Sequence, residues 1–154
     1  MENKHIEDYL RAIYKLEETH GIARTSMIAQ ELGVKPATVT KMLEKLARLG
    51  LVTWEPYRGV KLTEIGREIA KRIVRRHRIA ECFFYHMLGF DPVKSHIYAH
   101  LVEHLPDEVF DRLYELLGRP SRCPHGSPIP SIESSSITRE VKLATLLGDE
   151  EKHS

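Results

Sequence analysis

Residues 25–50 read TSMIAQELGVKPATVTKMLEKLARLG, and this stretch decides the fold of the first half of the chain. It predicts two short helices, of which the first can be capped by the hydroxyl of Thr25 or Ser26 and ends at Gly33. Pro36 then opens the second helix, because a first helical turn tolerates proline. One apolar stripe follows at helical spacing, formed by Val39, Leu43, Leu46 and Leu49. Two helices joined by such a tight turn are typical of a helix-turn-helix.

The segments on either side complete a winged helix. Apolar residues recur at helical spacing over residues 4–19, which predicts a preceding amphipathic helix. Residues 51–62, LVTWEPYRGVKL, place two β-prone runs around a turn, so we expect a hairpin with Arg58 at its tip. We expect Trp54 and Tyr57 to pack this hairpin rather than contact a ligand.

Beyond the hairpin the sequence predicts a second, helical module. The predicted segments are a connecting helix rich in Lys and Arg over residues 63–86, a helix over 92–104 that Asp91-Pro92 opens, a helix over 106–118, an irregular Pro/Gly-rich stretch over 119–130, and a weakly helical segment over 131–147. The expected fold class is all-α with a small β-hairpin wing. We expect a DNA-binding type of domain over residues 1–72, a second domain over 73–147 and a tail over 148–154.

The charge of the chain is unevenly distributed. The 23 basic and 22 acidic side chains sum to a formal net charge of +1. Residues 35–78 contain 12 basic and 4 acidic residues, an excess of +8, whereas residues 79–154 contain 7 basic and 12 acidic residues, an excess of −5. A basic segment followed by an acidic one indicates one module that faces nucleic acid and a second module with a different function.

Composition excludes several classes of protein. The 154 residues are 42% hydrophobic and 29% charged, which is typical of a globular chain. No stretch approaches the ~18 apolar residues that a membrane span needs, and Met1–Leu10 has no apolar signal region. The only cysteines are Cys82 and Cys123, so a disulfide scaffold is excluded and a reducing cytoplasm is the expected location.

The second helix of the helix-turn-helix has the side chains of a recognition helix. Such a helix presents short polar residues and cations to the major groove from its N-terminal turns. The candidate DNA-contacting residues are Lys35, Pro36, Ala37, Thr38, Thr40 and Lys41, together with Arg58 at the wing tip. The alternative is a winged helix that binds another protein. The basic excess favours DNA, because phosphate neutralisation is the main source of affinity for such readers.

Five of the nine histidines lie between residues 77 and 104, and several fall at metal-chelating spacing. The candidate ligands are His100, Glu103 and His104 at positions i, i+3 and i+4, His96 one turn earlier, and the i, i+4 pair His77 and Glu81. Imidazole with carboxylate is a ligand set for divalent manganese, iron, cobalt or zinc. Asp8 lies opposite the apolar stripe of the first helix, so it is free to face the second module.

Residues 100–104 also match the H-x-x-E-H pattern of inverted zinc proteases, in which two histidines bind zinc and the glutamate is a general base. Such an enzyme needs a third ligand and a sheeted substrate cleft, and the residues after His104 have little strand signal. We therefore do not expect an enzyme. The other alternative is a winged-helix regulator that is not gated by metal.

These features together resemble the diphtheria-toxin-repressor and manganese-transport-regulator family of metal-dependent transcriptional repressors. The stretches that match run from Asp8 to Tyr14, Val39 to Leu46, Tyr57 to Gly59, Arg76 to Arg78 with Glu81, His96 to His104, and Pro124 to Pro130. The chain ends too early for the SH3-like domain of the longer relatives, so we expect the short form. The resemblance implies a homodimer that a divalent metal ion locks for binding to a palindromic operator, at genes of manganese or iron homeostasis.

The resemblance also implies which residues bind metal. The family's primary site matches Asp8, His100, Glu103 and His104, its second site matches His77, Glu81 and His96, and the ligands that some manganese-responsive members use instead match Cys123 and His125. For the last pair the alternative is a proline-rich connector with no ligand role.

Two departures from the family bear on the metal. Position 100 is His, where iron-type relatives tend to have Cys and manganese-type relatives Glu. Arg11 replaces a carboxylate of the two-manganese site of some relatives. Because the primary set has no thiol or thioether, Mn(II) is slightly favoured over Fe(II).

The resemblance implies a two-state switch. Metal would join Asp8 to the second domain and hold the two recognition helices of the dimer about one DNA turn apart, ~34–36 Å. We expect the helices over residues 92–104 and 106–118 to form the twofold interface, with Phe110, Leu113 and Leu117.

Overall fold

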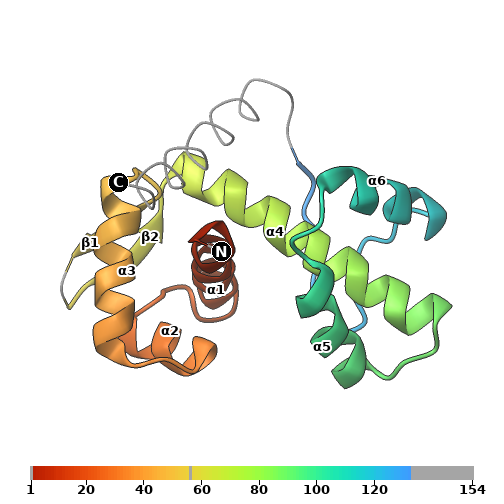
Figure 1. Cartoon of the computed structure of the whole chain (residues 1–154), viewed down its shortest axis with the longest axis horizontal. Coiled ribbons are helices and arrows are strands. Elements are labelled where there is room, and N and C mark those ends of the chain that lie inside the picture. Colours follow the sequence, from red (N-terminus) through yellow and green to blue (C-terminus); the bar gives the residue numbers. More distant parts are fainter. Residues whose placement is uncertain (1, 56, 133–154) are drawn as a thin grey trace. The chain divides into compact units, whose positions relative to one another are not determined.

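The computed structural model describes residues 2–55 and 57–132, which are mostly helical with one hairpin (Figure 1). The elements are α1 (Glu2–His20), α2 (Thr25–Leu32), α3 (Pro36–Arg48), β1 (Val52–Glu55), β2 (Gly59–Leu62), α4 (Glu64–Cys82), the π-helical turn η1 (Phe83–Met87), α5 (Pro92–Val102) and α6 (Asp107–Leu116). The predicted fold class is confirmed. The weakly helical segment and tail expected after Ile132 lie outside the described residues, as does Pro56 of the predicted wing turn. None of the helices described is both long and apolar enough to cross a membrane.

The chain divides into two compact units, and the division falls inside α4, after Ala70. In the first unit α2 packs against both α1 and α3, while the hairpin packs on α3 through β1 and on α1 through β2. The two strands are antiparallel, with Val52 opposite Leu62 and Glu55 opposite Gly59. Figure 1 shows this hairpin beside α3, as a winged helix requires.

The apolar stripes predicted from the sequence form the core of the first unit. Fully buried side chains are Leu10 and Ile13 of α1, Ile28 of α2, and Val39, Leu43 and Leu46 of α3. Glu17 of α1 ties the end of the hairpin to this core. Its Oε1 accepts a hydrogen bond from the backbone N–H of Leu62 at 3.2 Å, and its Oε2 accepts one from Arg67 Nη2 at 2.8 Å.

One predicted helix start is confirmed and another is wrong. Asp91 caps α5, because its Oδ1 accepts a hydrogen bond from the backbone N–H of Lys94 at 2.8 Å. The N-cap of α2 is Arg24, whose backbone is extended and whose side chain makes no capping hydrogen bond. The cap expected at Thr25 or Ser26 is wrong, since both residues lie inside the first turn of the helix.

The second unit, Lys71–Ile132, packs its own small core around the last turns of α4. Its buried cluster consists of Ile79, Ala80, Ala99 and Phe110, with Leu113 and Leu117 partly buried against it. Phe110 is only 2% exposed. Phe110 therefore packs into the interior of the unit, and the prediction that it lies in a twofold interface is wrong. Leu113 and Leu117 are only partly buried, and their place in that interface stays a prediction.

Arginines of α4 are paired within the second unit. Asp107 of α6 receives two of them, with Arg76 Nη1 at 2.9 Å from Oδ1 and Arg72 Nη1 at 3.4 Å from Oδ2. Arg75 Nη2 lies 3.7 Å from Asp111 Oδ1. Part of the basic excess over residues 35–78 therefore neutralises acidic residues of α6 rather than facing a phosphate backbone.

Gly66 allows the first turn of α4 to approach the start of β1. A Cβ atom at this position would collide with the carbonyl oxygen of Leu51 and lie 2.9 Å from its carbonyl carbon. In an open helix, alanine is about 0.8–1.0 kcal/mol more favourable than glycine. Here we expect Gly66→Ala to lower the free energy of unfolding by about 1–3 kcal/mol, because the backbone at Leu51 must move.

Urea denaturation measures this change, with Gln30→Ala at an exposed position of α2 as the control. The control variant should stay within about 0.5 kcal/mol of the parent chain. A Gly66→Ala variant more stable than the parent would contradict the close approach.

Candidate metal centre and nucleic-acid interface

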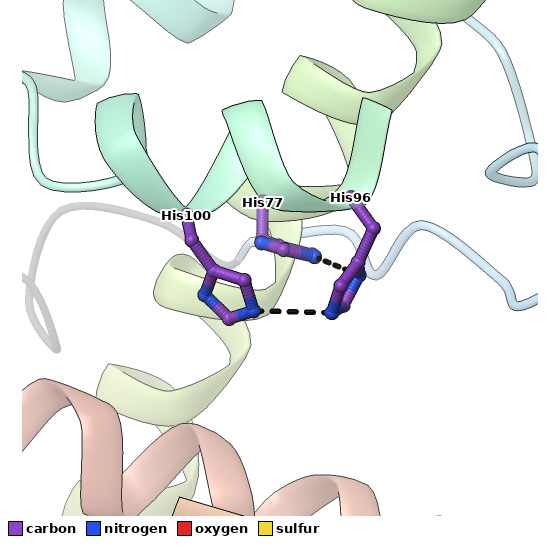
Figure 2. Close-up of side chains that lie close together, drawn as sticks. All are labelled: His77, His96 and His100. Carbon is purple, nitrogen blue, oxygen red and sulfur yellow. Dashed lines mark hydrogen bonds between the residues drawn. The ribbon is translucent and has the colours of Figure 1, made fainter. Parts of the chain in front are cut away.

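Ligand-type side chains from α4 and α5 meet in the second unit. His77 and Glu81 lie one turn apart on α4, and His96 and His100 lie one turn apart on α5. Figure 2 shows the imidazoles of His77, His96 and His100 pointing toward one another from the two helices. The i, i+4 spacing in the sequence thus places two ligand-type side chains on the same face of each helix, and these two faces are turned toward each other.

The nitrogens of these three imidazoles lie in close pairs. His77 Nε2 is 3.1 Å from His96 Nδ1, and His96 Nε2 is 3.1 Å from His100 Nε2. One ligand nitrogen from each ring lies within 4.8 Å of the other two. The His77 ring is buried, whereas about a third of the His96 and His100 side chains is exposed. The three-histidine group is therefore buried at His77 and open to solvent at His96 and His100.

Two buried carboxylates flank the imidazoles. Glu103 Oε2 lies 2.6 Å from His77 Nδ1, and Glu103 Oε1 lies 3.5 Å from His100 Nδ1. Glu81 Oε1 lies 3.2 Å from His77 Nε2, and its Oε2 lies 3.3 Å from His96 Nδ1. Burial alone would raise the pKa of the Glu81 carboxyl. Hydrogen bonds and charge attraction from His77 and His96 outweigh burial, so this pKa is well below its usual range and Glu81 is ionised.

Glu81 also belongs to a second group, with Cys123 and His125. One ligand atom from each of the three lies within 4.8 Å of the others, and His125 Nδ1 is 2.9 Å from Glu81 Oε2. Residues 123–127 form a turn that two backbone hydrogen bonds of 2.9 Å close. Cys123 N–H donates to the Ser127 carbonyl, and Gly126 N–H donates to the Cys123 carbonyl. The structure therefore brings the Cys-Pro-His segment to α4.

Two side chains of α4 hold that turn in place. Arg78 Nη1 donates to the carbonyl of Pro128 at 2.6 Å, and the Cys82 thiol donates to the carbonyl of Arg122 at 3.4 Å. Burial raises the pKa of the Cys82 thiol to about 12, and the neighbouring Cys123 adds to this effect. Cys82 therefore supports the turn as a buried hydrogen-bond donor.

The remaining predicted ligands are His104 and Asp8. His104 Nε2 lies 3.5 Å from Glu103 Oε1, the same oxygen that faces His100. Asp8 belongs to the first unit, where its Oδ1 lies 3.6 Å from Arg11 Nη2. The joining of Asp8 to residues of the second unit stays a prediction.

The residues of the second unit fit a divalent metal ion. They offer imidazoles, carboxylates and one thiol, the donors that manganese, iron, cobalt and zinc take in proteins. A metal-binding histidine commonly donates its other ring N–H to a carboxylate, which orients the ring. The short contact between His77 Nδ1 and Glu103 has this geometry.

The predicted DNA-contacting residues lie on the surface of the first unit. Exposed residues at the start of α3 are Lys35, Pro36, Ala37, Thr38 and Lys41. Thr40 is half-buried, and its hydroxyl donates to the carbonyl of Pro36 at 3.2 Å. Arg58 is exposed on the wing, with its Nη1 3.4 Å from Glu55 Oε2.

A hollow beside this face was not predicted from the sequence. Its volume is about 390 Å³, and it is lined by Arg24, Thr25, Ser26, Pro36, Trp54, Tyr57 and Gly59. Tyr57 is 99% exposed, so the expectation that it packs the hairpin is wrong. Its backbone has φ 69°, a left-handed conformation that residues other than glycine rarely adopt.

Two protein-family models match the chain in succession. Residues 2–60 match the N-terminal DNA binding domain of iron dependent repressors. Residues 63–131 match the metal binding and dimerisation domain of the same family. Both parts of the resemblance noted in the sequence are thereby confirmed.

Individual relatives agree with this assignment. An uncharacterised HTH-type transcriptional regulator of Methanocaldococcus jannaschii is 43% identical over 110 residues, which cover 70% of this chain and 88% of that protein. The HTH-type transcriptional regulator MntR of Listeria monocytogenes is 44% identical over 116 residues, covering 73% and 79%.

Among solved structures, a manganese-dependent transcriptional repressor in complex with manganese matches with a TM-score of 0.76 at 35% identity. The match covers 85% of this chain and 63% of that repressor. The metallohydrolase alternative is excluded, because the matching family consists of transcriptional repressors. The chain belongs to the iron-dependent repressor family, whose members are metal-dependent, DNA-binding transcriptional regulators.

Proposed function

We propose that this chain acts in the cytoplasm as a homodimeric repressor, which binds a palindromic operator when a divalent metal ion, Mn(II) or Fe(II), is bound. The observation that carries the proposal is the convergence of imidazoles and carboxylates from α4 and α5 in a chain that also exposes a basic winged helix. Genes of manganese or iron homeostasis are the expected targets, since their expression must follow the concentration of the ion.

The proposed ligands come from three places in the chain. The primary set is Asp8, His100, Glu103 and His104, and further metal is held by His77, Glu81 and His96 or by Glu81 with Cys123 and His125. Asp8 is in the first unit and the other residues are in the second. An ion that takes donors from both units restricts their relative motion, and so favours the arrangement of recognition helices that fits an operator.

Removing one metal ligand should abolish the effect of metal on DNA binding. We expect His104→Ala to abolish the metal dependence of operator affinity, while chelator lowers the affinity of the parent chain at least about tenfold. A gel-shift titration with and without Mn(II) or Fe(II) measures both.

His86→Ala is the matched control, because His86 is exposed and lies outside the ligand groups of the second unit. If operator affinity of the parent chain is indifferent to chelator, the chain is a regulator that is not gated by metal. A normal metal response in His104→Ala would remove that residue from the primary set.

The predicted DNA-contacting residues of α3 and the wing should bind the operator through its phosphates. Lys41→Ala and Arg58→Ala should each weaken operator binding and reduce the slope of log affinity against log salt by about 1. Metal affinity should not change. Fluorescence anisotropy across a salt series measures the slope, with Lys94→Ala on the exposed face of α5 as a control that leaves it intact. An unchanged slope in both variants would place the DNA contacts elsewhere.

The outer face of α5 is the proposed twofold interface. Val93, Ile97 and Leu101 follow one another at i, i+4 spacing, and each side chain is more than half exposed. An apolar stripe of this kind is unusual on a monomer, and it lies in the domain that matches the family's dimerisation domain. A second copy of the chain is the occupant that these observations favour.

A charge in this stripe should break the dimer. We expect Ile97→Glu to shift the chain from dimer to monomer in analytical ultracentrifugation, because a carboxylate at the centre of an apolar interface is desolvated without a partner. Leu116→Glu is the control, since Leu116 is also an exposed apolar residue, at 63% on α6 against 52% for Ile97 on α5. An intact dimer in Ile97→Glu would overturn the assignment of this face.

A further inference from the structure

We infer that the hollow between the start of α2, the start of α3 and the wing holds one sugar-phosphate unit of the operator backbone, with Tyr57 packed on the deoxyribose and Arg24 paired with the phosphate. The inference rests on the proposed function for its ligand, duplex DNA. It goes beyond that function because Arg24, Trp54 and Tyr57 lie outside the predicted DNA-contacting set, and because their contacts do not depend on base sequence.

The hollow offers both apolar and polar surface. Pro36, Trp54 and Tyr57 line it with rings. Arg24 supplies a cation, and the two residues that follow it in the chain and also line the hollow bear hydroxyls. A deoxyribose has an apolar face and is joined to an anionic phosphate, so it needs both kinds of surface. Arginine, serine and threonine are among the residues that commonly bond to the DNA backbone.

The ring of Tyr57 is available to a partner. Tyr57 is 99% exposed, so its ring makes almost no contact within the first unit. Its left-handed backbone, φ 69°, is unfavourable for a residue with a Cβ atom. Backbone conformations of this kind concentrate at sites that clamp a ligand. Because no packing inside the unit accounts for this one, a contact outside the unit is the explanation that the geometry favours.

The wing is fixed to the segment that precedes α2. The backbone N–H of Val60 donates to the carbonyl of Ala23 at 2.8 Å, and the two residues form an antiparallel bridge. Gly59 permits this approach, because a Cβ atom there would lie 2.8 Å from the same carbonyl oxygen. Arg24 directly follows Ala23, so the two sides of the hollow are joined through the backbone. A site that is organised in this way loses little conformational freedom when it binds.

Charge and position single out DNA as the occupant. Residues 24–26, 35–36 and 54–59, which line or adjoin the hollow, contain three cations and one carboxylate. This local positive charge complements a phosphate backbone. Pro36 both lines the hollow and opens α3. A nucleotide in the hollow therefore lies beside the N-terminal turn that a recognition helix presents to the major groove.

The first part of the test measures affinity and its salt dependence. The probe is a fluorescent palindromic duplex that the parent chain with Mn(II) selects from random sequences, and binding is followed by anisotropy. We expect Tyr57→Ala and Arg24→Ala each to weaken binding at least about fivefold. Only Arg24→Ala should reduce the slope of log affinity against log salt, by about 1, because only that variant loses a charge. The penalty for changing a single base pair should be the same as in the parent chain.

The second part identifies the phosphate. Single phosphates of one half-site are replaced in turn by uncharged methylphosphonates. At one position we expect the replacement to weaken binding of the parent chain at least about tenfold and to leave binding of Arg24→Ala unchanged. Tyr57→Phe, which keeps the ring, should recover most of the affinity that Tyr57→Ala loses. Arg112→Ala, at an exposed arginine of α6, is the control for loss of a charge outside the hollow.

Each outcome separates the inference from the proposed function. Circular dichroism confirms that the variants are folded. If the parent chain binds the duplex and both Tyr57→Ala and Arg24→Ala bind it equally well, DNA binding stands and the inference is overturned. The inference also fails if no methylphosphonate position distinguishes Arg24→Ala from the parent chain. If the variants behave as expected but chelator leaves the parent's affinity unchanged, the hollow holds the backbone and the proposed metal gating fails. A parent chain that selects no duplex overturns both.

Discussion

The contact between His77 Nδ1 and Glu103 Oε2, at 2.6 Å, is the interaction on which the second unit depends. It joins the middle of α4 to the end of α5, and both side chains are almost completely buried. Burying an imidazole and a carboxylate is costly unless each finds a partner, so loss of either one would leave the other unsatisfied. Arg76 reinforces the same junction, because its Nε donates to the Glu103 carbonyl at 2.7 Å. These polar contacts of Glu103 with His77 and Arg76 thus fix the position of the C-terminal end of α5 against α4.

A small apolar core explains why polar contacts matter so much in this unit. Its buried cluster consists of four side chains, two of them alanine, among the described residues. Arginines of α4 pair with acidic residues of α6 around that core, and Arg78 holds the 122–128 turn through the Pro128 carbonyl. Partly buried arginine pairs fix geometry more than they add stability. A unit built this way positions ligand side chains without a large hydrophobic interior.

Sequence periodicity predicted the elements, because the apolar stripes of the first three helices and the Asp91-Pro92 cap are local signals. Which face of one helix meets which face of another is not local. The spacing placed His100 with Glu103 and His104, and only the packing of α5 on α4 shows it beside His77 and His96. The same limit applies to Phe110, whose stripe on α6 could not be assigned to a core or an interface from spacing alone. The left-handed backbone conformation of Tyr57 is likewise not indicated by any pattern of side chains in the sequence.

The two faces of α5 connect the proposed metal site to the proposed dimer. His96 and His100 point toward α4, and Val93, Ile97 and Leu101 form the exposed stripe. Successive residues of a helix are about 100° apart, so Ile97 lies somewhat more than a quarter turn around the helix from His96. A single rigid helix of 11 residues therefore bears both surfaces. An ion bound by the histidines would restrain the orientation of α5, and with it the apolar stripe offered to a second copy. Metal occupancy and dimer geometry are then coupled through one helix, without any need for a longer pathway.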